Sequence, residues 1–315
     1  MAVDKNFSDY HSIMNETPSV SVLMINKNHG HYLEKTLQSY LNQSYSNIEI
    51  IVMDGGSTDN SIQIMEKYKS VKVHSTNDKS GGEAFANSLK YSTSNLVMFA
   101  TSNDVLVDSE FISQAVTFLT KNKEYACVFG NVVNLDPDNK IGELVHPYNK
   151  KGYFNDYNKN FRRWLINYES FHELAAIFRR ESVLRAVGDL ESYSKPISEL
   201  EADMFLELRF GFYANGFKAK FLDFKVIAIR NHADRVSVES RAHFTRHLRK
   251  YSEQVGNFRI QFLKRNYYFV SPSHHVIKTL GLARHLYMGL VIIVQLAVTR
   301  LKNMMKFLIR KDYLL

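Results

Sequence analysis

Two apolar runs near the start of the chain, separated by a stretch of helical pattern, constrain the fold more than any other feature. Val20–Ile25 and Ile48–Met53 are rich in β-branched residues, and each is followed by small or polar residues. Such runs are typical of parallel strands buried on both faces. With the helical segment Tyr32–Gln43 between them, they predict a β-α-β unit. Parallel sheets bind ligands beyond the carboxyl ends of their strands, which places Asp54 and the turn after it at the expected binding edge.

Alternating strand and helix patterns continue to about residue 240. We expect further strands over 71–75, 96–101 and 125–135, a strand and turn over 141–152, and helices over 60–67, 83–91, 111–121 and 182–187. No Gly-x-Gly-x-x-Gly motif follows the first strand, which argues against a nicotinamide-dependent oxidoreductase. The pattern predicts an α/β fold in which helices flank a mostly parallel sheet.

The first β-α-β unit resembles the opening of family 2 glycosyltransferases, which have the GT-A fold. Positions that match the family pattern are Pro18, Val20, Ser21, Val22, Asn28, Leu33, Ser39, Leu41, Gln43, Tyr45, Asp54, Gly56, Ser57 and Asp59. The resemblance implies a Rossmann-like, mostly parallel central sheet. It also implies an inverting transfer of a sugar from a nucleotide diphosphate donor, with UDP favoured, to a hydroxyl of a glycan or lipid-linked acceptor. Relatives of this kind often build bacterial cell-surface polysaccharides.

The resemblance also indicates which residues would hold the donor. Asp54 follows the apolar run Ile-Ile-Val-Met, where a carboxylate has no packing role, and it could accept hydrogen bonds from a base or a ribose. The other expected nucleotide-sugar residues are Ile25, Asn26, Asn28, Gly56, Ser57, Lys79, Gly81, Asn103 and Asp104. A glycine pair such as Gly81-Gly82 is equally typical of a simple turn, so the role of that loop stays open.

A divalent cation, Mn²⁺ or Mg²⁺, usually neutralises the leaving diphosphate in this family, and it prefers carboxylate oxygens. Family members carry an acidic cluster after the strand that corresponds to 96–101. Here residues 101–104 read Thr-Ser-Asn-Asp, so a single carboxylate stands in that cluster. We expect Asp104 and His232 to be the metal ligands, the latter because Arg230-Asn231-His232 resembles a strand-end step of the family. His232 could also contact the diphosphate, or be a surface histidine on a loop. Two alternatives follow from the missing acids: Asn103 and Asp104 could simply form a turn, or the chain could be a nucleotide-sugar binding or assembly protein with weakened catalysis.

The segment 198–209 resembles the family pattern in which an aspartate six residues before an arginine is the general base. That spacing selects Asp203, paired with Arg209, and leaves Glu199 and Glu201 as substitutes. A single base and a direct displacement would invert the anomeric centre. The alternative interpretation is an ordinary amphipathic helix whose acidic residues face solvent.

The ends of the chain differ in composition from its middle. We expect residues 1–17 to be a polar leader, 18–240 a GT-A glycosyltransferase domain, and 241–315 a basic amphipathic helical extension. The uncharged run Leu286–Thr299 would extend only ~21 Å as a helix, short of a ~30 Å hydrocarbon layer. The extension could therefore lie on an anionic membrane surface, or pack on protein, including a second copy of the chain.

The net charge of +8 favours anionic partners, but the basic residues of the extension accompany apolar ones, so we expect no nucleic-acid partner. The single cysteine, Cys127, allows no internal disulfide. Because the first seventeen residues also lack the apolar core of a signal peptide, we expect a cytoplasmic protein that can be peripheral on the inner face of the cell membrane.

Overall fold

The computed structural model describes residues 17–136, 140–145, 171–194 and 204–230, and two short paired strands, β10 (Phe269–Val270) and β11 (Val276–Ile277). Its main sheet has the strand order β3-β2-β1-β4-β8-β6-β9-β5, with β7 added beside β6. The predicted leader 1–17, apart from Thr17, and nearly all of the predicted extension 241–315 lie outside the described residues. Of the strand and turn expected over 141–152, the structure describes residues 141–145, which include the strand Ile141–Leu144.

One half of the sheet is parallel, as the sequence predicts. It consists of β1 (Val20–Asn26), β2 (Ile48–Asp54), β3 (Val71–Ser75) and β4 (Leu96–Thr101). The registers align the strand ends: Asn26 stands opposite Asp54, and Ile25 opposite Thr101. Polar residues at the carboxyl ends of β1, β2 and β4 therefore meet along one edge.

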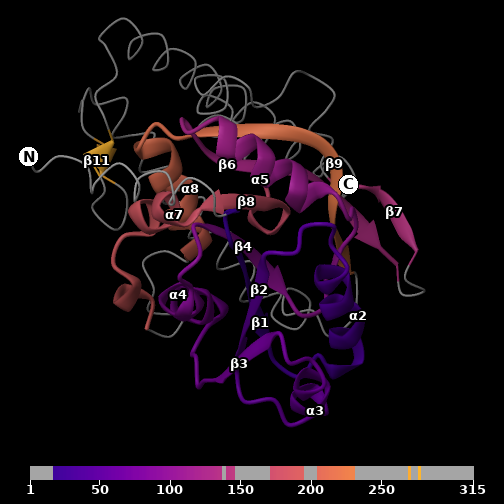
Figure 1. Ribbon diagram of the computed structural model, residues 1–315. Coiled ribbons are helices and arrows are strands. Elements are labelled where there is room, and N and C mark those ends of the chain that lie inside the picture. The colour runs from indigo at the N-terminus through magenta and orange to yellow at the C-terminus, as the bar shows by residue number, and fades with distance from the viewer. Residues whose placement is uncertain are drawn as a thin grey trace, which may run out of the picture.

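The other half of the sheet is mixed. It contains β5 (Val105–Leu106), β6 (Tyr125–Leu135), β7 (Ile141–Leu144), β8 (Ala176–Arg179) and β9 (Lys218–Arg230). The short strand β8 pairs antiparallel with both β4 and β6, and so joins the two halves. The long strand β9, orange in Figure 1, curves over the domain. Near its end, Ile227 and Ala228 pair with β5, so that β9 returns to the same edge as the parallel strands.

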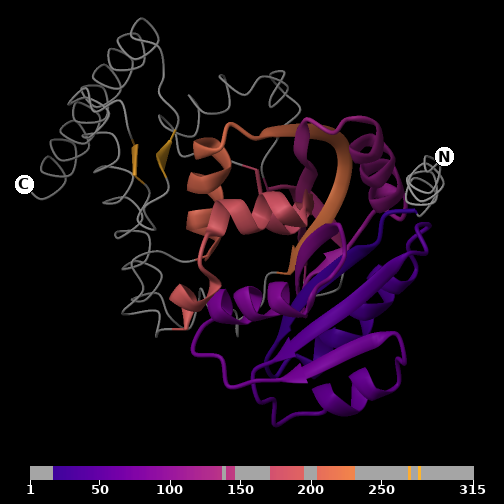
Figure 2. The same cartoon turned by 60° about the vertical axis from the view of Figure 1, so that its left-hand side comes forward.

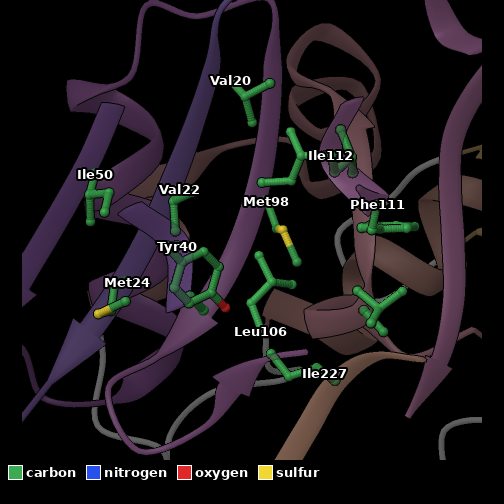
Figure 3. Packing of buried hydrophobic residues seen from close by; sticks show 14 of the residues in the cluster. Val20, Val22, Met24, Tyr40, Ile50, Met98, Leu106, Phe111, Ile112 and Ile227 are labelled. Atoms are coloured by element: carbon green, nitrogen blue, oxygen red, sulfur yellow. The ribbon is translucent and has the colours of Figure 1, made fainter. Parts of the chain in front are cut away.

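Helices cover both faces of the sheet, as Figures 1 and 2 show. Side chains alternate along β1, so that Leu23 packs into one core and Val22 and Met24 into the other. The first core lies under α4 (Gly81–Tyr91), α7 (Arg180–Val187) and α8 (Met204–Ala214), with the 3₁₀ turns η2 (Glu173–Ala175) and η3 (Leu190–Tyr193). The second lies under α2 (Gly30–Leu41), α3 (Ser61–Glu66) and α5 (Phe111–Lys121), and Figure 3 shows its packing around Tyr40 and Met98.

Three helices, α2, α4 and α7, begin two residues earlier than the sequence pattern predicts, and side-chain hydrogen bonds explain the first two. The Ser80 hydroxyl accepts a hydrogen bond from the Glu83 amide at 3.1 Å, and the Glu83 carboxylate accepts one from the Lys79 amide at 2.6 Å. This reciprocal capping starts α4 at Gly81 rather than at residue 83. Asp59, from a different loop, accepts a hydrogen bond from the Gly30 amide at 2.8 Å, and α2 starts there rather than at residue 32. The strands at 71–75, 96–101 and 125–135 and the helix at 111–121 are confirmed with their predicted bounds.

No helix in the described part of the chain combines the length and the apolar composition needed to cross a membrane.

Candidate functional site

A cavity of about 730 Å³ opens at the carboxyl edge of the parallel strands. It extends from the end of β2, across β1, to the end of β4, and its far walls are formed by the start of α2, the residues around η2 and the end of β9. The structure brings the following predicted site residues to its lining: Ile25, Asn26, Asn28, Gly81, Asn103 and Asp104. The predicted residues Asp54, Gly56, Ser57 and Lys79 are placed outside that lining.

Asp54 lies behind Asn26 rather than in the cavity. Its side chain is buried, and its Oδ1 accepts hydrogen bonds from Asn26 Nδ2 at 2.7 Å and from the Ser57 hydroxyl at 2.6 Å. The amide of Ser57 donates to the second carboxylate oxygen at 2.8 Å. In this position the carboxylate holds the side-chain amide of Asn26, and the expected contact of Asp54 with a base or ribose stays a prediction.

The remaining residues of the Gly-Gly-Ser-Thr-Asp turn shape two loops. Asn28 adopts a left-handed backbone conformation, with φ of 56°. Its main-chain N–H donates a hydrogen bond to the Ser57 hydroxyl at 2.9 Å. Its side-chain oxygen accepts a hydrogen bond from the Thr58 amide at 2.8 Å. Gly56 has φ of 76°, a conformation that favours glycine. These contacts tie the loop after β1 to the loop after β2, so that Gly56 and Ser57 support the cavity from outside.

At the β4 side of the cavity, Asp104 is held by two hydrogen bonds. One carboxylate oxygen accepts from the Arg230 amide at 3.0 Å, and the other from the Thr101 hydroxyl at 2.6 Å. Asp104 is 4% exposed. Burial, together with the negative charge of Asp104, raises the pKa of the nearby Tyr40 hydroxyl, which stays protonated.

Arg230 places a positive charge against the same turn. Its Nε donates to the main-chain oxygen of Asn103 at 3.1 Å, and its guanidinium lies 4.5 Å from the centre of the Tyr32 ring. The residue is only 2% exposed. A cation stacked on an aromatic ring and bonded to the turn fixes Asn103 and Asp104 in position.

The donor set at this end suits a Mg²⁺-like ion, which typically takes one or two carboxylates and completes its shell with water and substrate phosphates. Asp104 supplies a carboxylate at the cavity, and Asn103 supplies an amide side chain beside it. Among the described residues, no three His, Cys, Asp or Glu side chains gather into a metal site. The second predicted ligand, His232, lies outside the described residues.

The loop before α4 contributes less than the sequence suggested. Gly81 lines the cavity as the first residue of α4. The Lys79 ammonium instead donates to the main-chain oxygen of Ser194 at 3.2 Å, on the exposed side of the loop. The lysine therefore joins α4 to the turn η3.

Several lining residues were missed by sequence reasoning. They include His29 and Tyr32 at the start of α2, Asp78 in the loop before α4, and Leu174 in η2. His29 and Tyr32 follow directly on the end of β1, a position that could have flagged them. Leu174 carries no such signal, because only the pairing of β8 with β4 brings η2 to this edge.

Asp203, the predicted base, lies outside the described residues, but the helix that follows it is described. Arg209 in α8 forms a two-fold ion pair with Glu173 in η2, with one of its N–H···O contacts at 2.9 Å. Glu173 is buried. At the start of the helix, the Met204 amide nitrogen lies 3.6 Å from where a Cβ on Gly82 would stand, next to the cavity residue Gly81. The ion pair thus fixes α8 against the wall of the cavity.

Comparison with curated proteins identifies relatives of this chain. An uncharacterized glycosyltransferase of Haemophilus influenzae is 30% identical over 171 residues, which are 53% of this chain and 64% of the relative. The Escherichia coli UDP-Glc:alpha-D-GlcNAc-diphosphoundecaprenol beta-1,3-glucosyltransferase WfgD is 29% identical over 138 residues, 42% of this chain and 54% of that enzyme. The chain thus spans less than two thirds of the length of either relative.

Solved structures share the fold at low sequence identity. Staphylococcus aureus TarS 1–349 in complex with UDP is 18% identical, with a TM-score of 0.55 over 87% of this chain and 70% of that one. The mannosyltransferase PcManGT of Pyrobaculum calidifontis is 16% identical, with a TM-score of 0.51, and the match covers 78% of this chain and 66% of the mannosyltransferase chain. These likenesses confirm the GT-A fold. The family model described as glycosyl transferase family 2 matches residues 21–185, more than half of the sequence, and the chain therefore belongs to glycosyl transferase family 2.

Proposed function

We propose that this chain transfers a sugar, with inversion, from a nucleotide diphosphate donor to a hydroxyl of a glycan or lipid-linked acceptor in cell-surface polysaccharide synthesis. One observation carries the proposal: a single cavity is lined by Met53 at the end of β2, by Asn26 at the end of β1, and by Asp104 after the end of β4. Two strand spacings, about 10 Å, separate the ends of β2 and β4, which suits a nucleoside at the β2 side and a diphosphate at the β4 side. The name of the E. coli relative, a glucosyltransferase that uses UDP-glucose and a lipid-linked acceptor, supports the same class of reaction.

The two sides of the cavity differ in chemistry. Ile25, Met53 and Ala84 offer apolar surface near Asn26, which suits a flat base. Asn103 and Asp104 offer oxygen ligands on the other side. We place the nucleoside at the first and the diphosphate at the second. A divalent cation held by Asp104 and Asn103, with His232 as a further ligand, would neutralise the charge that develops on the leaving diphosphate.

Asp203 is the proposed general base, which takes the proton from the acceptor hydroxyl as that oxygen attacks the anomeric carbon. The support comes from its neighbour in sequence, because Met204 lies against Gly82 beside the cavity. One base and one displacement, with no covalent sugar–enzyme intermediate, give inversion.

The second candidate is a nucleotide-sugar binding or assembly protein that does not turn over. The observation that favours it is the strand-end sequence Thr-Ser-Asn-Asp, in which one carboxylate stands where the family usually has two or more. This candidate keeps the cavity and the donor, but assigns no role to Asp203.

For the whole chain, we propose a catalytic unit over 18–240 and a basic extension over 241–315 that contacts an anionic membrane surface from the cytoplasmic side. Flotation with anionic vesicles, with and without residues 275–315, tests the second part. Equal recovery of both forms in the soluble fraction would contradict a membrane contact and favour packing on protein.

The test of the reaction measures release of nucleoside diphosphate from a panel of nucleotide sugars, with Mn²⁺ or Mg²⁺ present. We expect turnover with at least one donor, and a loss of about 100-fold or more in Asp203→Asn with donor binding retained. Glu201→Gln is the matched control and should keep activity. Donor binding without turnover in either metal would instead support the binding protein, and full activity of Asp203→Asn would show that the base lies elsewhere.

A further inference from the structure

We propose that Glu173 and Arg209 are positioning residues for the transfer step. Their ion pair fixes the helix α8, which begins directly after the proposed base Asp203, relative to the cavity wall that contains His172 and Leu174. This role rests on the proposed glycosyl transfer, and it adds two residues that act on the reaction through their neighbours rather than by contact with a substrate.

The segment that leads into η2 alternates between two neighbours. His172 and Leu174 line the cavity, whereas Phe171 and Glu173 contact α8. A shift of the helix would therefore also move the two residues that face the cavity. This segment is the part of the wall through which α8 can act on the site.

The contacts with this segment come from one face of α8. Arg209 and Phe212 are three positions apart, and residues at this spacing lie on the same side of a helix. The ring of Phe212 lies 5.0 Å from that of Phe171, centre to centre. Beside this apolar contact, the Arg209 guanidinium donates two hydrogen bonds to the Glu173 carboxylate, one of them at 2.9 Å. The rings give adhesion, and the ion pair adds a fixed orientation.

The start of α8 lies against another part of the cavity wall. A Cβ on Gly82 would stand 3.6 Å from the main-chain nitrogen of Met204 and 3.8 Å from its Cβ. The ring of Phe205 lies 4.9 Å from that of Phe85 in α4, centre to centre. Gly81, at the start of α4, lines the cavity. The same short helix thus contacts α4 at its start and η2 about 7.5 Å further along its axis.

The burial of the ion pair favours a role in geometry. The Glu173 side chain is 3% exposed. Removing a carboxylate and a guanidinium from water is costly, and an apolar pair of similar size often stabilises a fold equally well. A two-fold guanidinium–carboxylate contact instead sets the relative orientation of the two groups. A transfer step depends on such orientation, because a displacement of about 1 Å can lower its rate by about 100-fold.

The first test replaces the guanidinium by a compact cation. Arg209→Lys keeps the charge but loses the planar fork. Arg185→Lys is the matched control, because Arg185 forms an exposed ion pair with Glu181 on the neighbouring helix α7. Turnover is measured with the most active donor of the nucleotide-sugar panel. Active sites are counted by calorimetry with the nucleoside diphosphate that this donor releases, so that unfolded protein does not enter the rate.

We expect Arg209→Lys to lower kcat per site by about 10- to 100-fold, with KM for the donor and Kd for the nucleoside diphosphate within about threefold of the wild type. Arg185→Lys should match the wild type in all three. A purely structural role of the ion pair would reduce the number of binding sites but leave the rate at each site unchanged, and that result would overturn the inference.

The second test asks whether the two residues act as a unit. Glu173→Gln removes the charge of the partner and keeps its shape, and we expect a similar loss of kcat per site. The double variant Glu173→Gln/Arg209→Lys should be no slower than the slower single variant, because both changes break the same contact. Losses that multiply in the double variant would contradict a joint role.

The wild type separates this role from the proposed function. Absence of turnover with every donor would refute glycosyl transfer, and the role of the pair with it. Turnover in the wild type that persists at full rate per site in Arg209→Lys would refute only the role of the pair.

Discussion

Asn26 donates a hydrogen bond to the carboxylate of Asp54 at 2.7 Å, across two adjacent parallel strands. The contact joins residues at equivalent positions at the ends of β1 and β2. A carboxylate at the end of a buried strand is expected to face a ligand, but here it orients the side chain of a residue in the cavity lining. The geometry of the cavity therefore depends on a second layer of hydrogen bonds behind its lining.

Ser57 is the centre of that second layer. Its hydroxyl donates to the Asp54 carboxylate, and accepts from the side-chain NH₂ of Asn26 and from the main-chain N–H of Asn28. Ser57→Ala removes these contacts while the main-chain bond to Asp54 remains, and we expect the free energy of unfolding to fall by about 1–2 kcal/mol. Ser44→Ala, which removes one exposed hydrogen bond, is the control and should cost less than about 0.5 kcal/mol. Urea denaturation measures both, and equal losses would contradict the central position of Ser57.

Asp59 makes the stability of the chain depend on pH. Burial raises the pKa of its carboxyl, but hydrogen bonds from Ser61 and Gly30 outweigh that effect and lower the pKa below its usual value of 3.8. A lowered pKa means that Asp59 stabilises the fold above its pKa in the unfolded chain, and that this stabilisation is lost as the pH falls through its pKa in the folded protein.

The corresponding measurement compares the wild type with Asp59→Asn. At neutral pH we expect the variant to be less stable by about 1 kcal/mol, because both carboxylate oxygens accept main-chain hydrogen bonds and an amide side chain keeps only one acceptor oxygen. The difference should shrink as the pH falls below 3.8. A difference that is constant across this range would show that the charge of Asp59 plays no part.

The sequence predicted the position of the cavity, because the two apolar runs define parallel strands and such strands bind ligands at their carboxyl ends. It did not predict the role of Asp54, since that depends on the register that places Asn26 opposite it, 28 positions away in the chain. The same holds for Arg230, which reaches Asn103 only because β9 returns to this edge. Local patterns predict elements, whereas contacts between distant segments decide which side chain faces the ligand.

The strand-end turn offers a direct test of metal binding. Asn103→Asp adds a second carboxylate beside Asp104, and we expect the affinity for Mn²⁺, measured with UDP present, to rise on the order of tenfold because charged oxygen ligands bind hard cations more strongly. Asp104→Asn should lower it by a similar factor. Binding of Mn²⁺ followed by electron paramagnetic resonance gives a readout independent of turnover. Unchanged affinity in Asp104→Asn would place the metal elsewhere.

The ion pair of Arg209 and Glu173 should respond unequally to removal of its two partners. The Glu173 side chain is 3% exposed and that of Arg209 28%. Arg209→Met leaves a buried carboxylate without this cation, and we expect the free energy of unfolding to fall by about 3 kcal/mol. Glu173→Gln leaves a guanidinium that water can reach, and should cost less. Thermal or urea unfolding of both single variants and of the double variant measures whether Arg209→Met is the less stable single variant. A double variant less stable than Arg209→Met would contradict the expectation that an unpaired buried carboxylate causes the larger loss.

The most direct test of the account is a crystal structure of the full chain with bound UDP. We predict that the base lies against Ile25 and Met53, and that the diphosphate lies beside Asn103 and Asp104. A nucleotide bound outside this cavity, or one whose base lies at Asp104 and whose phosphates lie at Asn26, would contradict it.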